Sequence, residues 1–185
     1  MPFTFHKVDS IEGPVIVEPA VFADSRGYFL ESFRKDQFAQ NGIAEDFLQD
    51  NHSLSSKGTL RGLHFQTDPA AQGKLVSVIT GAVWDVAVDL RKGSPTFGKW
   101  FGVELSGENH RMFYIPPGFA HGFLTLEDNT HFVYKCTAYY SPEHDGGIRW
   151  NDPDLAIDWP GNVEPLVSDK DGTLPFLADW QKEQG

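Results

Sequence analysis

The sequence contains little cysteine and no long apolar run. Its single cysteine, Cys136, cannot form an internal disulfide, which fits a reducing cytosol. No stretch reaches the roughly 18 apolar residues that a membrane-spanning helix needs. The first residues, MPFTFHKVDS, also lack the basic and apolar segments of a signal peptide. We therefore expect a cytoplasmic protein without a membrane anchor.

Basic residues are also scarce, and the net charge is −11. This charge argues against broad binding to nucleic acid or to an anionic membrane surface. A small anionic ligand remains compatible with it, provided that arginine and lysine gather at one site. If the chain binds such a ligand, we expect the arginine and lysine residues near the candidate catalytic motifs to form its site.

Apolar residues make up 40% of the chain and aromatic residues 14%, which predicts a packed globular body. No repeat, low-complexity segment or Gly/Ser linker divides the chain. Its 185 residues fit one domain with a full core. We expect a single domain over residues 1–185.

Strands are expected over most of the chain, because β-branched and aromatic segments follow one another between turn residues. The segments are PVIVEPAVF, GYFLESF, TLRGLHFQ, KLVSVITGAVWDVAVDL, KWFGVELS, RMFYIPPG, AHGFLTLE and THFVYKCTAYY. Many short strands at this spacing predict an all-β fold, a sandwich or jelly-roll barrel with a few short helices.

Two other segments are predicted from local pattern. RKDQFAQNGI, residues 34–43, reads as a short helix with Phe38 and Ile43 facing inward and Asn41-Gly42 at its end. In GYFLESF, strand alternation would place Glu31 on one face with two phenylalanines.

The tail after Pro142 is rich in Asp, Pro and Gly, and we expect ordered loops there. Its large apolar residues are too many for a free tail. They are Trp150, Ile157, Trp159, Leu166 and Trp180.

One strand carries carboxylates among apolar residues. Alternation in KLVSVITGAVWDVAVDL places Asp85 and Asp89 on a face with Val83 and Ala87. A carboxylate buried there is costly unless it is paired. Asp85 is therefore either a structural hydrogen-bond acceptor or the partner of a histidine.

Two histidine motifs raise the question of a metal. LRGLHFQ contains His64, and IPPGFAHGF supplies His121 after a Pro-Pro-Gly turn. A metal-binding barrel of this kind would want His-x-His, but the third position is Gln66, a poor ligand. Lys74 nearby would also oppose a cation. We expect no metal and no other cofactor.

Proton transfer is the alternative use of these side chains. Strand alternation sends Leu60, Gly62, His64 and Gln66 to one side. Neutral histidine is a good general base near pH 7 when a carboxylate fixes its tautomer. Asp171 in SDKDGTLP and Asp85 are both candidates for that carboxylate.

Tyrosine could supply the acid. Tyr134 and Tyr140 in FVYKCTAYY have an even spacing that would put both on one strand face, where they either act chemically or only pack. The basic residues beside these motifs are either an internal anion site or solvated charges. They are Arg26, Arg61, Lys74 and Lys170.

Six segments, taken together, carry a family resemblance. They are FADSRGYFLESF, QDNHSLSSKGTLRGLHFQ, QGKLVSVITGAVWDVAVDLRKGSPTFGKW, PPGFAHGF, YKCTAYYSPEHDGGIRWNDPDLAIDWP and SDKD. In this combination the chain resembles the dTDP-4-dehydrorhamnose 3,5-epimerase family from about Val15 to Pro175. The resemblance implies a cupin jelly roll that works without metal, and a cytoplasmic homodimer with exchanged N-terminal strands. It places the enzyme in dTDP-L-rhamnose biosynthesis.

The resemblance also implies roles for individual residues. His64 matches the proton acceptor, Asp171 its paired carboxylate, Tyr134 the proton donor, and Lys74 a group near the keto oxygen. Substrate-binding positions are matched by Arg26, Glu31, Gln49, Asp50, Asn51, Arg61, His121 and Tyr140, and less closely by Glu143 and Lys170. Among these, Tyr140 matches the ring that stacks on thymine.

The implied substrate is a dTDP-linked 4-keto-6-deoxyhexose, whose C3 and C5 protons are both α to the ketone. Removing each proton to give an enolate and returning it from the opposite face inverts the centre without a redox cofactor. An epimerase of one centre, or a 3,4-ketoisomerase, would use similar residues. A metal-dependent cupin oxygenase and a non-catalytic sugar-binding cupin are the alternatives from other classes.

Overall fold

The computed structural model describes residues 2–161 and 164–183 of the chain. Its elements are β1 (Phe3–Lys7), β2 (Val15–Pro19), β3 (Phe22–Asp24), β4 (Gly27–Phe29), α1 (Lys35–Gln40), β5 (Gln49–Ser55), β6 (Leu60–Gln66), β7 (Lys74–Thr80), β8 (Ala82–Asp89), β9 (Trp100–Ser106), β10 (Met112–Ile115), β11 (Phe119–Thr125), β12 (Thr130–Cys136), β13 (Asp145–Gly147), α2 (Asp169–Gly172) and α3 (Leu177–Glu183). None of the helices described is long and apolar enough to cross a membrane.

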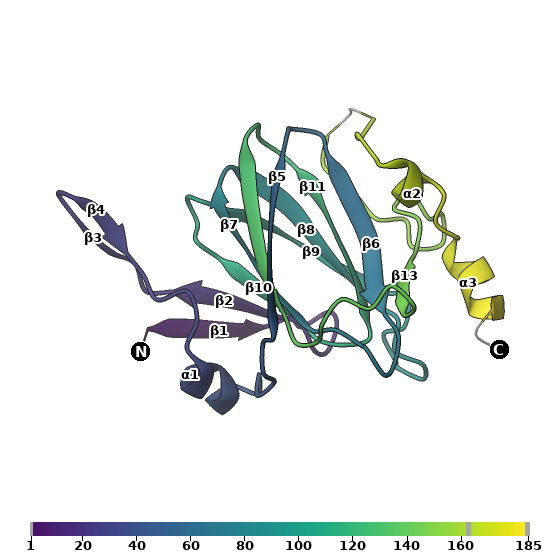
Figure 1. Cartoon of the computed structure of the whole chain (residues 1–185), viewed down its shortest axis with the longest axis horizontal. Helices are drawn as coiled ribbons and strands as arrows, with labels where there is room; N and C mark the ends of the chain where they lie inside the picture. Colours follow the sequence, from purple (N-terminus) through teal and green to yellow (C-terminus); the bar gives the residue numbers. More distant parts are fainter. Residues whose placement is uncertain (1, 162–163, 184–185) are drawn as a thin grey trace.

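Two antiparallel sheets face each other (Figure 1). One has six strands in the order β1-β2-β10-β7-β12-β5, and the other has five in the order β13-β6-β11-β8-β9. The predicted all-β jelly roll is confirmed. Helices α2 and α3 lie beside the five-stranded sheet, and the hairpin β3–β4 extends away from the barrel.

The main core lies between the two sheets. Phe113 and Phe132 of the six-stranded sheet meet Val83 and Leu105 of the other, and all four are fully buried. The opposite side chains of β8, including Val86, pack in a second cluster with the C-terminal segment. Because β8 is covered on both faces, its alternation separates two cores rather than a core and a solvent face.

The predicted helix is confirmed in a shorter form as α1, with Phe38 and Ile43 buried and Asn41 as its C-cap. The predicted strand through Phe33 is wrong, because β4 ends at Phe29. Its partner β3 has only three residues, so pairing stops there. Glu31 therefore shares no strand face with two phenylalanines.

The tail is ordered, as predicted, but it is not all loop, since it contains β13, α2 and α3. Trp159 and Trp180 pack against the second cluster. Leu166 is the exception, because its side chain is 63% exposed. Its main chain bonds both Gly58 and Leu60, so the backbone rather than the side chain fixes this segment.

Candidate active site

A cavity of about 310 Å³ opens between the two sheets and is bordered by α2. Its lining residues are Ser53, Arg61, His64, Lys74, His121, Phe123, Tyr134, Ser168, Lys170 and Asp171. Seven of these ten were predicted as site residues from the sequence. Most of the side chains are polar or charged, and the cavity is therefore the candidate active site.

His64 on β6 is paired with Asp171 on α2. The Nε2–H of His64 donates to Oδ1 of Asp171 at 2.7 Å, and the Gly62 amide donates to Oδ2 at 3.1 Å. Ser168 caps α2 by accepting from the Asp171 amide. Burial tends to raise the pKa of Asp171, but the hydrogen bond from His64 and the His64 charge lower it overall. Asp171 thus stays ionised and leaves Nδ1 of His64 as the ring nitrogen available to a substrate.

A bulge brings His64 and Arg61 into the same cavity. His121 pairs with His64 and Phe123 pairs with Arg61, so β6 has one residue more than β11 in this interval. Gly62 sits there with φ +128°, and a Cβ on it would lie 2.5 Å from the Gly122 Cα. The predicted regular alternation from Leu60 to Gln66 is therefore wrong at Gly62, where only glycine fits.

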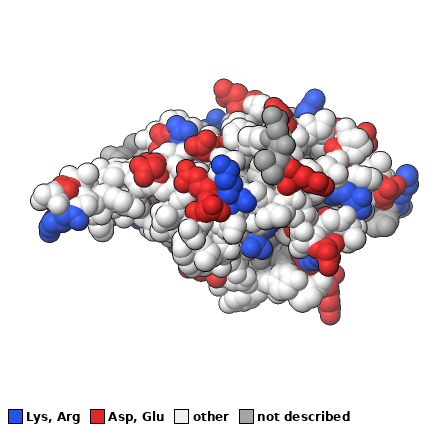
Figure 2. Space-filling model, turned by 90° about the horizontal axis from the view of Figure 1, so that it is seen from above, with Lys and Arg blue, Asp and Glu red and all other residues white. Residues whose placement is uncertain are grey.

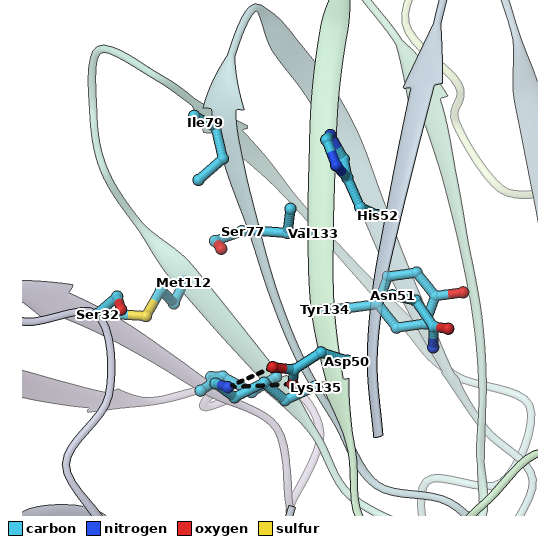
Figure 3. A pocket seen from close by; sticks show the side chains of 11 residues that line it. Ser32, Asp50, Asn51, His52, Ser77, Ile79, Met112, Val133, Tyr134 and Lys135 are labelled. Carbon is cyan, nitrogen blue, oxygen red and sulfur yellow. Dashed lines mark hydrogen bonds and ion pairs between the residues drawn. The ribbon is translucent and has the colours of Figure 1, made fainter. Parts of the chain in front are cut away.

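Tyr134 faces this pair from the other sheet. It lies on β12, next to Asn51 of β5 in the strand register, and Figure 3 shows the two side chains together. Burial raises the pKa of Tyr134, and the nearby Arg61 cation offsets part of the rise. The phenol is therefore protonated in the resting protein.

Lys74, at the start of β7, reaches the cavity from the six-stranded sheet. It is 8% exposed, and no hydrogen bond to its ammonium is found among the described residues. Burial lowers the pKa of Lys74, while Cys136, Asp145 and Asp85 act in the opposite direction. A buried, unpaired ammonium is poised to bind an anionic oxygen.

His121 and Asp85 form a second histidine–carboxylate pair. The His121 Nε2 lies 2.9 Å from Oδ2 of Asp85, and both side chains are buried. Asp85 was predicted to be either a structural hydrogen-bond acceptor or the partner of a histidine, and the structure shows it paired with His121. Burial raises the pKa of Asp85, and His121 and Lys74 counter this rise.

Tyr140 stands at the rim rather than beside Tyr134. The prediction that both lie on one strand face is wrong, because β12 ends at Cys136. The Tyr140 hydroxyl instead donates to Asp145 at 3.4 Å, and Asp145 also accepts from Lys170 at 2.5 Å. This hydrogen bond raises the pKa of Lys170 and ties the rim to the cavity.

Seven predicted binding residues are not among those that line this cavity, namely Arg26, Glu31, Gln49, Asp50, Asn51, Tyr140 and Glu143. Gln49 and Asn51 lie on β5 beside it, where Gln49 accepts from the Tyr140 amide. Arg26 is on the β3–β4 hairpin, 87% exposed and paired with Asp24. The Glu31 Oε2 is buried without a hydrogen-bond partner among the described residues and lies 3.9 Å from the Arg34 guanidinium. Asp50 pairs with Lys135 on the outer face of the six-stranded sheet, drawn in Figure 3, and Glu143 is exposed.

Three cavity residues were missed from the sequence, namely Ser53, Phe123 and Ser168. The Ser53 hydroxyl is buried without a hydrogen-bond partner in the part of the chain described. A signal existed for Ser53, because alternation in QDNHS puts it on a face with Gln49 and Asn51. That segment is polar, and so it gave no apolar strand pattern.

Acidic residues outnumber basic ones in this chain, 26 to 15. Figure 2 shows acidic side chains spread over one face, with basic side chains standing singly or in small groups among them. Within residues 2–161 and 164–183, no three His, Cys, Asp or Glu side chains form a group that could hold a metal ion. The absence of a metal from the reaction stays a prediction.

The chain is similar to one enzyme family over most of its length. The family model for dTDP-4-dehydrorhamnose 3,5-epimerase matches residues 9–179. The dTDP-4-dehydrorhamnose 3,5-epimerase of Methanothermobacter thermautotrophicus is 54% identical over 171 residues, covering 91% of each chain. That of Salmonella typhimurium is 53% identical over 169 residues, covering 91% of this chain and 92% of the relative.

Solved structures share the fold. A Legionella pneumophila dTDP-6-deoxy-D-glucose-3,5-epimerase in complex with dTDP-4-keto-L-rhamnose matches with a TM-score of 0.91 and 50% identity, covering 95% of this chain and 93% of that one. A 3'-monoepimerase from Streptomyces bikiniensis in complex with dTDP-quinovose matches with a TM-score of 0.91 and 38% identity, covering 97% and 90%.

Proposed function

The chain belongs to the dTDP-4-dehydrorhamnose 3,5-epimerase family, and we propose that its cavity inverts C3 and C5 of dTDP-4-dehydro-6-deoxy-D-glucose. The product is dTDP-4-dehydro-L-rhamnose, in dTDP-L-rhamnose biosynthesis. The observation that carries the proposal is the placement of a histidine–carboxylate pair and a partly buried tyrosine on opposite sheets around one cavity. No cofactor takes part.

His64 is the base and Tyr134 the acid in this mechanism. Nδ1 of His64 removes a proton from C3 or C5, and the charge of Asp171 stabilises the imidazolium that forms. The enolate then takes a proton from the Tyr134 hydroxyl on its other face, which inverts the centre. The Arg61 cation favours the phenolate left behind.

The enolate oxygen at C4 needs preorganised positive charge. Lys74 supplies it, because its ammonium lies in the cavity without a competing hydrogen bond in the described chain. His121, held by Asp85, adds a polar contact on the five-stranded sheet. Its ring is fixed before the substrate arrives, so little reorganisation is needed.

The dTDP group is bound along the rim. Arg61 and Lys170 supply cations for the diphosphate, and Tyr140 offers an aromatic face to thymine. Gln49 and Asn51 lie on the same face of β5 and extend this surface. Glu143 is on the same loop system as Tyr140 and is free to contact the nucleotide.

We also infer a cytoplasmic homodimer in which the hairpin β3–β4 reaches a second subunit. Phe22, Tyr28 and Phe29 on it are 62%, 55% and 66% exposed, a concentration of bare aromatic surface. The hairpin extends clear of its own barrel in Figure 1. Covering it with a second copy would bury these rings and bring Arg26 to the partner's cavity.

A single-centre epimerase is the second candidate. The observation in its favour is the similarity to the Streptomyces bikiniensis 3'-monoepimerase, which shares the fold at 38% identity. One or two inversions depend on how the sugar ring rests between His64 and Tyr134. The relatives at 53–54% identity are 3,5-epimerases, which favours two.

Incubation with dTDP-4-keto-6-deoxyglucose in deuterated water, with a chelator and no added metal, tests the proposal by proton NMR of the sugar. We expect deuterium at both C3 and C5 and conversion to the L-lyxo product. Deuterium at one carbon would establish the single-centre reaction instead. No exchange at either carbon would overturn the proposed activity, and exchange lost only with the chelator would overturn the metal-free mechanism.

A further inference from the structure

Three glutamine side chains hold the loop that carries Tyr140. Gln66 donates to the carbonyl of Tyr139 at 3.2 Å and accepts from the amide of Ser141 at 2.7 Å. Gln72 donates to the carbonyl of Ala138 at 2.6 Å, and Gln49 accepts from the amide of Tyr140 at 2.8 Å. We call these three side chains the glutamine clamp.

The loop has no other main-chain support of this kind. In the described chain, no main-chain group of residues 138–140 bonds another main-chain group. The strand β12 ends at Cys136, and the turn at His144 begins only at Ser141. The clamp therefore sets the path of the backbone between them.

Gln66 is the centre of the clamp. It is 5% exposed, and its amide makes three hydrogen bonds, the third to the carbonyl of Ala70 at 2.7 Å. A buried amide with both its nitrogen and its oxygen paired rigidifies the segments that it joins. It also lies on β6, two residues after His64, so the base and the loop are tied to one strand.

Tyr140 is the residue of this loop for which thymine stacking is proposed above. Its side chain is 55% exposed, and its one hydrogen bond, to Asp145, is long at 3.4 Å. The ring itself is thus weakly fixed, and its position depends on the backbone. A ring held in place before binding loses less conformational entropy when a base stacks on it.

We propose that Gln66 is a positioning residue for nucleotide recognition, acting through the backbone of residues 138–141 to present the Tyr140 ring to thymine. This inference rests on the proposed function, because the stacking role of Tyr140 is itself proposed. At the position where a metal-binding barrel would place a second histidine, this chain has a residue that builds the nucleotide site.

The test compares Gln66→Ala, Tyr140→Ala and the double variant in dTDP binding by calorimetry and in steady-state kinetics. Stacking of one base on an aromatic ring is commonly worth on the order of tenfold or more in affinity. We expect about that loss of dTDP affinity in Tyr140→Ala and a several-fold loss in Gln66→Ala, with KM rising while kcat stays within about threefold. The double variant should bind about as weakly as Tyr140→Ala alone, because Gln66 acts through that ring.

Asn109→Ala is the matched control. Asn109 also makes three hydrogen bonds to main chain, to Glu104, Ser106 and Arg111, but in a turn outside the cavity. The Asn109→Ala substitution should lower the melting temperature without changing the affinity for dTDP. Gln72→Ala should behave as a weaker version of Gln66→Ala, since it makes one bond to the loop.

The outcomes separate the two ideas. Unchanged dTDP affinity in Tyr140→Ala would contradict the stacking role in the proposed function. Weakened binding in Tyr140→Ala with unchanged binding in Gln66→Ala would overturn this inference alone. Fully additive losses in the double variant, or a loss of kcat in Gln66→Ala as large as the rise in KM, would also overturn it.

Discussion

The cavity and the β3–β4 hairpin use charged and aromatic side chains in opposite ways. In the cavity, Asp171 and His64 come from distant parts of the chain and meet at 2.7 Å, with Asp171 buried and His64 partly buried. On the hairpin, Arg26 pairs only with Asp24, two residues away, and both are exposed. The cavity is assembled by tertiary contacts, whereas the hairpin is held mainly by local ones, with the packing of Tyr28 on His110 as a tertiary contact.

This difference separates the groups proposed for proton transfer from the groups proposed to complete nucleotide binding. The groups proposed for proton transfer lie within one chain, around one hollow. The hairpin carries the predicted nucleotide-binding residue Arg26 and three aromatic rings. All four side chains stay more than half exposed, although the Tyr28 ring packs against His110 of the same chain. We propose that a second subunit covers them.

The largest effect should follow from removing the base. Positioned acid–base groups contribute about 10²–10⁴-fold, so His64→Ala should lose epimerisation and deuterium exchange at both C3 and C5 by a factor in that range. Added imidazole should restore part of the exchange. A His64→Ala protein with full activity would remove both the base assignment and the mechanism.

Lys74 should come next. Lys74→Met should lower kcat by about 10²–10³-fold, the usual cost of losing one donor to a developing oxyanion. Because burial lowers the pKa of Lys74, activity should fall with rising pH below the ordinary lysine pKa of about 10.4. Lys74→Arg should keep more activity than Lys74→Met and shift that alkaline limb upward, since arginine stays charged. An unchanged pH profile in Lys74→Arg would assign the limb to another group.

A stability comparison sharpens the contrast between interior and hairpin. Asp89 is fully buried and accepts from Arg91, Ser94 and Thr96, whereas Asp24 is exposed. Asp89→Asn should cost about 2 kcal/mol of unfolding free energy by losing charge-assisted bonds. Asp24→Asn should leave the denaturation midpoint essentially unchanged.

The contribution of Asp89 to folding stability should fall at low pH. These hydrogen bonds hold the pKa of Asp89 below its ordinary value even though burial opposes them. Its contribution to stability is therefore full above about pH 4, the ordinary aspartate pKa, and is lost as the pH falls toward the folded pKa. Equal destabilisation by the two substitutions would show that the hairpin is as tightly held as the core.

The hairpin prediction has the smallest expected signal. If Arg26 acts in the partner's cavity, mixing inactive His64→Ala with weakened Arg26→Ala chains should create wild-type sites in about a quarter of all sites after subunit exchange. Sedimentation should give a dimer for each parent variant. Activity that does not exceed the sum of the parents would place Arg26 in its own chain's site or in none.

Much of this fold follows from sequence pattern. Alternation in β8 correctly put Val83, Asp85 and Ala87 on one face, because that strand is regular and covered on both sides. The strand β5 was not predicted by the same reasoning, because the inward-facing positions of QDNHSLS are polar. One of them, Ser53, lines the cavity. A functional face is where apolar periodicity fails as a guide.

The site was predictable in kind but not in arrangement. His64 and Arg61 are three residues apart, so regular alternation would put them on opposite faces of the strand. The bulge at Gly62 brings both to the cavity. Tyr140 is six residues after Tyr134, an even spacing that would put both on one face, but the strand ends at Cys136. Whether Asp85 or Asp171 would pair with His64 depended on tertiary contacts that spacing does not encode.

The measurement that tests the two-sided mechanism most directly is Tyr134→Phe with substrate in deuterated water. His64 should still remove protons and return deuterium from its own face, so the account predicts labelled substrate of unchanged configuration and a much larger loss of epimerisation than of exchange. Exchange and epimerisation falling by the same factor would contradict it, because Tyr134 would then not be the donor that acts after deprotonation.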